Sequence, residues 1–330
     1  MSKKTAFVTG STGFLGITLT QELVSAGWEV VAFHRPSSDL RELKKLAQVR
    51  YALGDITDAD SVLAAIPEQV DAVFHTAGSV GFFDSSKDAQ QYQINVLGTR
   101  NAVEAALEKK SRRFIHTSTI LTYDYSQPQP ITEDTPPNSN SKYSYISSKY
   151  QGELEVEKAA DRGLDAVILH PSIIFGAYDR TGWSQMFREI SRGPRIPLAP
   201  PGRANVCHMR EVARAHISAF HKGGSGEHYM LGGPEKSLRE MVDAVAAILN
   251  KPGPRFTAPA ALFRFLCRVD NMTASWLGRK PMVTQAEAEI LCEDCVCSSD
   301  KAIRELDYQP AALETMLEDC YQWMKSEDLL

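Results

Sequence analysis

Hydrophobic positions in the first half of the chain alternate between two patterns. Short apolar runs have the composition of buried strands, and between them apolar residues recur at helical spacing, as at Leu15, Leu19 and Leu23. The expected strands are Ala6–Val8, Glu29–Phe33, Tyr51–Leu53, Ala72–His75, Phe114–Ser118 and Ala166–Leu169. One helix is expected directly after the first glycines, and three more are expected over 58–66, 88–109 and 145–162. Strands that alternate with helices predict an α/β fold with a doubly wound parallel sheet of Rossmann type.

The alternation weakens after Gly176. A loop with four prolines is expected over 193–202, and helices are expected over 211–221, 237–249, 259–291 and 311–325. A further strand is expected at His228–Leu231. We therefore expect residues 1–175 and about 205–233 to form the dinucleotide-binding domain. Residues of about 176–204 and 234–330 are expected to form a smaller, mostly C-terminal cap that binds the substrate.

Three glycines follow the first strand, at Gly10, Gly13 and Gly16. A strand, a glycine turn and a helix together are typical of dinucleotide binding. The glycines let the backbone approach a pyrophosphate, and the helix N-terminus presents free N–H groups and a positive dipole end. The spacing is G-x-x-G-x-x-G rather than the commoner G-x-G-x-x-G.

Tyr145 and Lys149 lie four residues apart on a predicted helix, so both side chains share one face. The pKa of a free tyrosine is about 10, and a nearby ammonium group is expected to lower it toward neutrality. The tyrosine can then exchange a proton with a substrate oxygen while hydride moves to or from a nicotinamide. Hydroxyls at the end of the preceding strand, Ser118 or Thr119, are placed to hold that oxygen.

The end of the second strand distinguishes NAD from NADP in doubly wound folds, because an acidic residue there binds the free ribose hydroxyls. This strand ends in His34-Arg35 and has no acidic residue at its tip. Arg35 presents a planar fork that suits a 2′-phosphate, with Arg41, Lys44 and Lys45 nearby in sequence. We expect NADP rather than NAD. The alternative for Arg35 is a solvated loop residue.

Composition narrows the class of protein. The chain has 330 residues and a net charge of −5, so no basic excess indicates a nucleic-acid partner. There is no apolar run of transmembrane length and no apolar secretory segment at the N-terminus, so we expect a cytoplasmic protein with reduced thiols. Cys292, Cys295 and Cys297 are close together but lack a second ligand pair, and we expect no metal site.

These motifs occur in an order that resembles the extended short-chain dehydrogenase/reductase family. The resemblance includes the glycine motif, Gly54-Asp55, His75-Thr76-Ala77, Asn95-Val-Leu-Gly-Thr, the hydroxyl strand, Tyr145/Lys149 and His170-Pro171-Ser172. It implies Thr119, Tyr145, Lys149 and Asn95 as the catalytic set, although a buried amide that only packs a helix is open for Asn95. It implies cofactor contacts from Gly10, Thr12, Gly13, Phe14, Leu15, Gly16, Arg35, Asp55, Ile56, Ala77, Ser118, Tyr145, Lys149, Pro171 and Ile174.

Within this family the chain is most similar to dihydroflavonol reductases, cinnamoyl-CoA reductases and 3β-hydroxysteroid dehydrogenases. That similarity implies reduction of a hydrophobic ketone or aldehyde, or the reverse reaction. The expected pocket walls are Phe83, Tyr123, Tyr178 and Phe187. The alternative is a nucleotide-sugar 4-epimerase with bound NAD, which would need arginines for the sugar diphosphate. Dehydration is disfavoured because Ile120-Leu121 stands where dehydratases carry Asp-Glu.

Three further questions concern turnover, assembly and contact with a membrane. A regulator that senses nucleotides without turnover is disfavoured by the intact Thr119, Tyr145 and Lys149. Family analogy implies a homodimer that acts on a small-molecule substrate. The stretch Ala260–Val269 is apolar enough to touch a membrane surface, but we expect it to be a buried cap helix.

Overall fold

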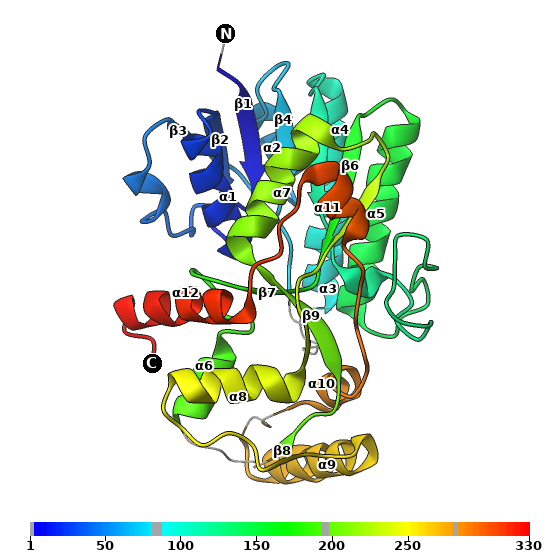
Figure 1. Cartoon of the computed structure of the whole chain (residues 1–330). Coiled ribbons are helices and arrows are strands. Elements are labelled where there is room, and N and C mark those ends of the chain that lie inside the picture. Colours follow the sequence, from blue (N-terminus) through cyan, green and yellow to red (C-terminus); the bar gives the residue numbers. More distant parts are fainter. Residues whose placement is uncertain (1–2, 81–87, 193–197, 280, 282) are drawn as a thin grey trace.

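A seven-stranded parallel sheet forms the centre of the larger lobe (Figure 1). The computed structural model describes residues 3–80, 88–192, 198–279, 281 and 283–330. The strand order is β10-β6-β5-β4-β1-β2-β3, and every neighbouring pair is parallel. The bounds are β1 Thr5–Thr9, β2 Glu29–His34, β3 Val49–Leu53, β4 Ala72–His75, β5 Arg113–Thr117, β6 Ala166–Pro171 and β10 His228–Leu231.

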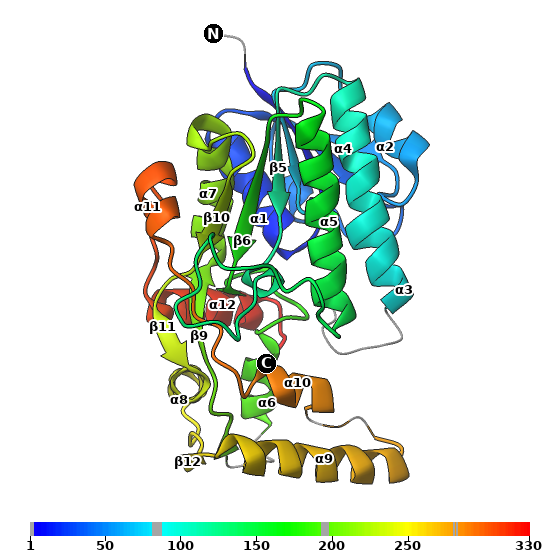
Figure 2. The ribbon, with the colours of Figure 1, turned by 90° about the vertical axis from the view of Figure 1, so that its right-hand side faces the viewer.

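Helices cover both faces of this sheet, as the sequence pattern predicts for doubly wound folds. One face is covered by α1 (Phe14–Ser25), α7 (Met209–Lys222) and α11 (Asp300–Leu306), and their buried side chains form one core cluster. The other is covered by α2 (Ala59–Ala65), α4 (Gly98–Glu108) and α5 (Ser144–Asp161), which form a second cluster. Figure 2 shows α4 and α5 side by side on that second face.

The order of the strands reverses at β1, whose neighbours are β2 on one side and β4 on the other. Ligands of doubly wound folds bind at such a switch point, outside the carboxyl ends of the strands. The predicted glycine turn and the hydroxyls after β5 therefore lie at the same edge of one sheet. The fold class expected from the sequence is confirmed.

The smaller lobe is built around a three-stranded sheet that the sequence pattern did not indicate. Its order is β11-β9-β7, with bounds Glu235–Ser237, Arg203–His208 and Ile173–Phe175. A short pair joins β8 (Leu198–Ala199) to β12 (Phe256–Thr257). The helices of this lobe are α6 Gln185–Ser191, α8 Leu238–Ile248, α9 Ala260–Trp276, α10 Gln285–Ile290 and α12 Leu313–Ser326.

Three expectations about the second half need correction. The helical stretch expected over 259–291 is two helices, α9 and α10, and they pack against each other. Helix α11 lies with the larger lobe instead of the cap, because Ala302 and Leu306 are buried in the core beside α1 and α7. Strand β9 belongs to the small sheet, whereas α7 and β10, which follow it, do return to the large sheet.

Candidate active site

The glycine turn fits a bound pyrophosphate. Gly10 has φ 65°, and a Cβ there would lie 2.7 Å from the backbone nitrogen of Ala77. A Cβ on Gly16 would lie 2.0 Å from the carbonyl oxygen of Gly10. Gly13 is the N-cap of α1 and supplies no side-chain acceptor, which keeps the first N–H groups of the helix available for an anion. Only glycine satisfies these constraints at Gly10 and Gly16.

Arg35 lies exposed at the tip of β2, next to this turn. Its backbone N–H donates to Ser38 Oγ at 3.1 Å, and no ion pair of its guanidinium group is found among the described residues. The neighbouring cations differ. Arg41 pairs with Asp39 at 2.8 Å and Lys45 pairs with Glu42 at 2.8 Å, so neither offers the additional free charge that we expected.

The remaining cofactor candidates lie along the carboxyl edge of the sheet. Asp55 Oδ1 accepts from the backbone N–H of Thr57 at 2.9 Å, while Asp58 caps α2. The side chain of Ile56 is buried in the core. Ala77 N–H donates to Thr9 Oγ1 at 3.2 Å, which holds the end of β4 against β1. The other candidates at this edge are Thr12, Phe14 and Leu15 around the start of α1, Pro171 at the end of β6 and Ile174 in β7.

Tyr145, Lys149 and Thr119 are brought together from α5 and the end of β5. Tyr145 and Thr119 are hydrogen-bonded through their side chains, and all three residues are buried. Lys149 Nζ donates to the carbonyl oxygen of Thr117 at 2.6 Å. The hydroxyl of Ser118 donates instead to Glu153. The structure therefore places Thr119, and not Ser118, against the phenol of Tyr145.

The electrostatics of this set differ from the expectation. Burial raises the pKa of Tyr145 well above its usual value, and the hydrogen bond from Thr119 offsets this only in part. Burial also lowers the pKa of Lys149 to about 8, against the opposing charge of Glu153. Burial outweighs any lowering of the tyrosine pKa by the lysine. Tyr145 is therefore a protonated phenol at neutral pH.

Asn95 lies in a π-helical turn, Tyr92–Leu97, between α3 (Asp88–Gln91) and α4. Its Oδ1 accepts from the backbone N–H of Ser79 at 2.7 Å, and its Nδ2 donates to Ser148 Oγ at 3.0 Å. The amide thus ties the segment after β4 to the residue that precedes Lys149. These contacts are those of a buried amide that packs a helix, and the catalytic role of Asn95 stays a prediction.

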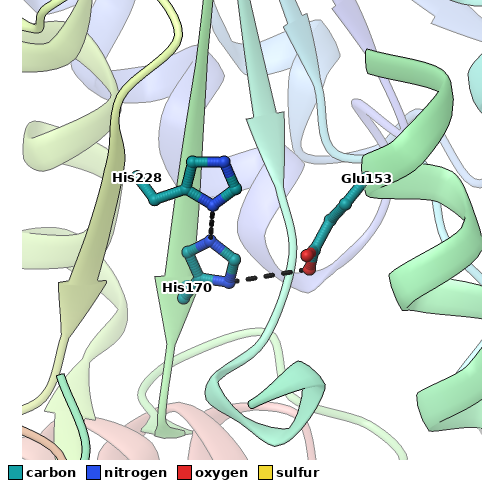
Figure 3. A group of neighbouring side chains, drawn as sticks. All are labelled: Glu153, His170 and His228. Carbon is teal, nitrogen blue, oxygen red and sulfur yellow. Dashed lines mark hydrogen bonds and ion pairs between the residues drawn. The ribbon is translucent and has the colours of Figure 1, made fainter. Parts of the chain in front are cut away.

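A buried polar chain that the sequence analysis missed continues from Ser118. Figure 3 shows Glu153, His170 and His228 in a row. Glu153 Oε1 lies 3.6 Å from His170 Nδ1, and His170 Nε2 lies 3.0 Å from His228 Nδ1. Burial raises the pKa of Glu153 to about 8 and holds the pKa of His170 well below its usual value. The signal that could have indicated Glu153 is its place four residues after Lys149, on the same helical face.

These three residues are also a group of metal-ligand types, with their ligand atoms within 4.8 Å of one another. The ring nitrogens of His170 are already engaged, one with the carbonyl oxygen of Thr119 at 3.2 Å and the other with His228. The hydrogen bonds of His170 to Thr119 and His228, together with its 3.6 Å contact with Glu153, describe the geometry better than an ion site. The backbones of Cys295 and Cys297 form isolated β-bridges with Ala204 and Ile131, respectively. Both thiols are buried, and burial raises the pKa of each to about 12.

The expected pocket walls differ in their surroundings. Phe187 is fully buried in the core of the cap, and Tyr123 is buried against His170. Contact of either side chain with a substrate stays a prediction. Tyr178 is partly buried, with φ 73°, and its hydroxyl accepts from Gln21 at 3.0 Å. Phe83 lies outside the described residues.

The fold and the site together define a dinucleotide-dependent enzyme of the extended short-chain dehydrogenase/reductase class. The chain belongs to the NAD dependent epimerase/dehydratase family, whose model matches residues 6–232. It is 28 % identical to a putative dihydroflavonol 4-reductase of Synechocystis sp. (strain ATCC 27184 / PCC 6803 / Kazusa), over 97 % of this chain and 94 % of the relative. It is also 28 % identical to a UDP-glucose 4-epimerase of Mycolicibacterium smegmatis, over 85 % of this chain and 94 % of that protein.

A solved structure, that of gox2253, superimposes with a TM-score of 0.85 and 28 % identity. The match covers 99 % of this chain and all of that one. The comparisons thus include both a named reductase and a named epimerase.

Proposed function

We propose that the protein is an NADP-dependent oxidoreductase that reduces a hydrophobic ketone or aldehyde to an alcohol, or catalyses the reverse reaction. The observation that carries the proposal is the arrangement of Thr119, Tyr145 and Lys149 at the sheet edge that also holds the glycine turn. A bound nicotinamide would supply or accept the hydride. The similarity to a named dihydroflavonol 4-reductase supports carbonyl reduction.

The protein's own part in the reaction is proton transfer and orientation. A carbonyl oxygen placed between Thr119 and Tyr145 accepts hydrogen bonds from both hydroxyls, and Tyr145 donates its proton to that oxygen as hydride arrives. The raised pKa of Tyr145 keeps the phenol protonated at neutral pH, which is the form that reduction requires. Lys149, hydrogen-bonded to Thr117, supplies positive charge beside the phenolate that remains.

Arg35 supports NADP as the cofactor, because an exposed guanidinium fork at the end of β2 suits a 2′-phosphate. The glycine turn and the N-terminus of α1 would hold the pyrophosphate.

The arrangement of cap arginines counts against the nucleotide-sugar alternative. Arg180 pairs with Glu327 at 2.6 Å, Arg203 with Glu235 at 2.5 Å and Arg192 with Glu189 at 3.3 Å. Arg188 donates to the backbone oxygen of Arg180. Arg195 lies outside the described residues. A sugar diphosphate would have to displace these carboxylates before it could use the arginines.

The test is consumption of NADPH with a panel of hydrophobic ketones and aldehydes, beside binding of UDP-sugars measured by thermal shift. We expect turnover with at least one carbonyl compound and no shift with UDP-sugars. A UDP-sugar shift without carbonyl turnover would replace this proposal with the 4-epimerase that uses bound NAD.

A further inference from the structure

Exposed apolar side chains are concentrated at one end of the molecule. Among the described residues, thirteen large hydrophobic side chains are exposed, and seven of them lie between positions 256 and 277. They include Phe265, Trp276 and Leu277, which are 59 %, 85 % and 73 % exposed. Figures 1 and 2 show that this segment, mainly α9, forms the end of the molecule opposite the N-terminus. A concentration of exposed apolar side chains of this kind usually marks an interaction site.

The exposed residues follow a helical period along α9. The members of this stripe are Leu262, Phe265, Val269, Met272 and Trp276. Their spacing of three and four residues places them on one face of the helix. The buried residues Phe263, Cys267 and Ala274 lie on the opposite face, which packs toward α10. The expectation of a buried cap helix is therefore correct for one face only.

The segment that carries this face has the opposite charge to the rest of the protein. Residues 251–280 contain six basic residues and one acidic residue, a net charge of +5 in a chain whose net charge is −5. Asp270 is paired with Arg279, and Arg264 is paired with Glu289 and Glu293. Arg255 and Arg268 are exposed, and neither forms an ion pair within the part of the chain that the structure describes.

An apolar stripe with Phe, Leu and Trp, bordered by free arginines, is the composition of a helix that lies in the interface of an anionic bilayer. No described helix is long and apolar enough to cross a membrane. A second copy of the chain fits this face less well, because a two-fold interface would place two surfaces of the same positive charge against each other. We propose that α9 docks the protein on the surface of an anionic lipid bilayer.

The test is flotation of the full-length protein with vesicles. One set is phosphatidylcholine alone, and the other contains roughly 30 % phosphatidylglycerol, which gives a surface potential that attracts basic residues. We expect binding to the anionic vesicles, a weaker signal with phosphatidylcholine alone, and loss of binding at high salt. In the same experiment the emission of Trp276 is expected to move to shorter wavelength, a change that Trp276→Phe removes.

The double variant Phe265→Ser/Trp276→Ser is expected to bind anionic vesicles at least about tenfold more weakly, because two apolar side chains no longer enter the acyl boundary. Ile303→Ser/Leu330→Ser is the matched control, since it removes exposed apolar side chains elsewhere and should bind like the wild type. Circular dichroism confirms that each variant is folded, and Arg255→Glu/Arg268→Glu replaces the first variant if that one is not.

Two results would overturn the proposal. One is a failure to bind through this face: either the wild-type protein does not float with anionic vesicles, or the folded variants float as well as the wild type does. The other is a dimer in solution that Phe265→Ser/Trp276→Ser converts to a monomer, which would assign this face to a second copy of the chain.

Discussion

The carboxyl edge of the large sheet and the outer face of α9 are opposites in the placement of polar and apolar groups. At the sheet edge Tyr145, Lys149 and Glu153 are buried, and the surroundings move the pKa of each away from its usual value. On α9 large apolar side chains face solvent. Buried ionisable groups are costly and cluster where chemistry occurs, whereas exposed apolar faces are usually covered by a partner. From this difference we propose that catalysis belongs to the carboxyl edge of the large sheet and docking to the outer face of α9.

The strongest test of the proposed catalytic role of the sheet edge is Tyr145→Phe, which removes the proton donor but keeps the aromatic ring. We expect kcat for carbonyl reduction to fall by about 10² to 10⁴-fold, the usual contribution of general acid catalysis, while NADPH still binds. The matched control is Tyr150→Phe on the same helix, which should retain activity. Steady-state kinetics and NADPH titration measure both. An active Tyr145→Phe enzyme would remove the basis for placing the chemistry at this edge.

Arg35→Ser tests whether the free guanidinium group selects the cofactor. Loss of one charged hydrogen-bonding partner is worth roughly 1.5–3 kcal/mol, so kcat/KM for NADPH should fall by about 10- to 100-fold with little change for NADH. Arg41→Ser is the control, because Arg41 is already paired with Asp39 and should not affect the preference. Equal losses for both cofactors would show that Arg35 does not read the 2′-phosphate.

Glu153→Gln tests whether the buried carboxyl group of Glu153 makes the stability of the protein depend on pH. The pKa of Glu153 is raised from 4.5 to about 8, so the folded protein holds a proton between these values that the unfolded chain has lost. The free energy of unfolding contributed by this group is therefore present below pH 4.5 and is lost as pH rises toward 8. In Glu153→Gln this fall in stability, of up to a few kcal/mol, should be reduced.

Urea unfolding at several pH values between 5 and 8 measures the effect. Glu157→Gln, with a half-exposed carboxylate on the same helix, is expected to change the slope less. Parallel pH profiles for wild type and Glu153→Gln would contradict the assignment.

The smallest expected effect is at His116, a fully buried residue of β5. Neither of its ring nitrogens has a hydrogen-bond partner among the described residues, and its ring stacks on His75 at 5.3 Å. His116→Leu removes two unsatisfied polar atoms and should raise the free energy of unfolding by about 1 kcal/mol. His75→Leu should lower it, because His75 is hydrogen-bonded to Thr9 and Thr99. Destabilisation by His116→Leu would indicate a partner for that ring.

Sequence patterns predicted the large sheet well because its strands are continuous apolar runs and each crossover helix begins and ends at a recognisable signal. Tyr145 and Lys149 were also predictable, since a local spacing on one helix identifies them. The end of one strand indicated Ser118 or Thr119, and only the resemblance to the family favoured Thr119. The side chains that Glu153, His170 and His228 contact were not predictable, because these residues come from α5, β6 and β10 and meet only in the folded protein.

The cap was predicted less well for a related reason. Strands β7 and β11 have only three residues each, and both pair with β9, which is far from them in sequence, so the small sheet depends on long-range contacts. Apolar residues on α9 recur on both faces of the helix, and a sequence pattern does not distinguish a face that packs inward from one that meets a partner. The roles of Tyr123 and Phe187 as pocket walls stay predictions for the same reason, since core and pocket side chains have the same composition.

The most direct test of the proposed function is a comparison of kcat/KM for NADPH and NADH in the wild-type protein, with one hydrophobic carbonyl substrate that it turns over. The free Arg35 beside the glycine turn predicts a value for NADPH at least about tenfold higher than for NADH. A value for NADPH equal to or lower than that for NADH would contradict the assignment of the protein as an NADP-dependent reductase.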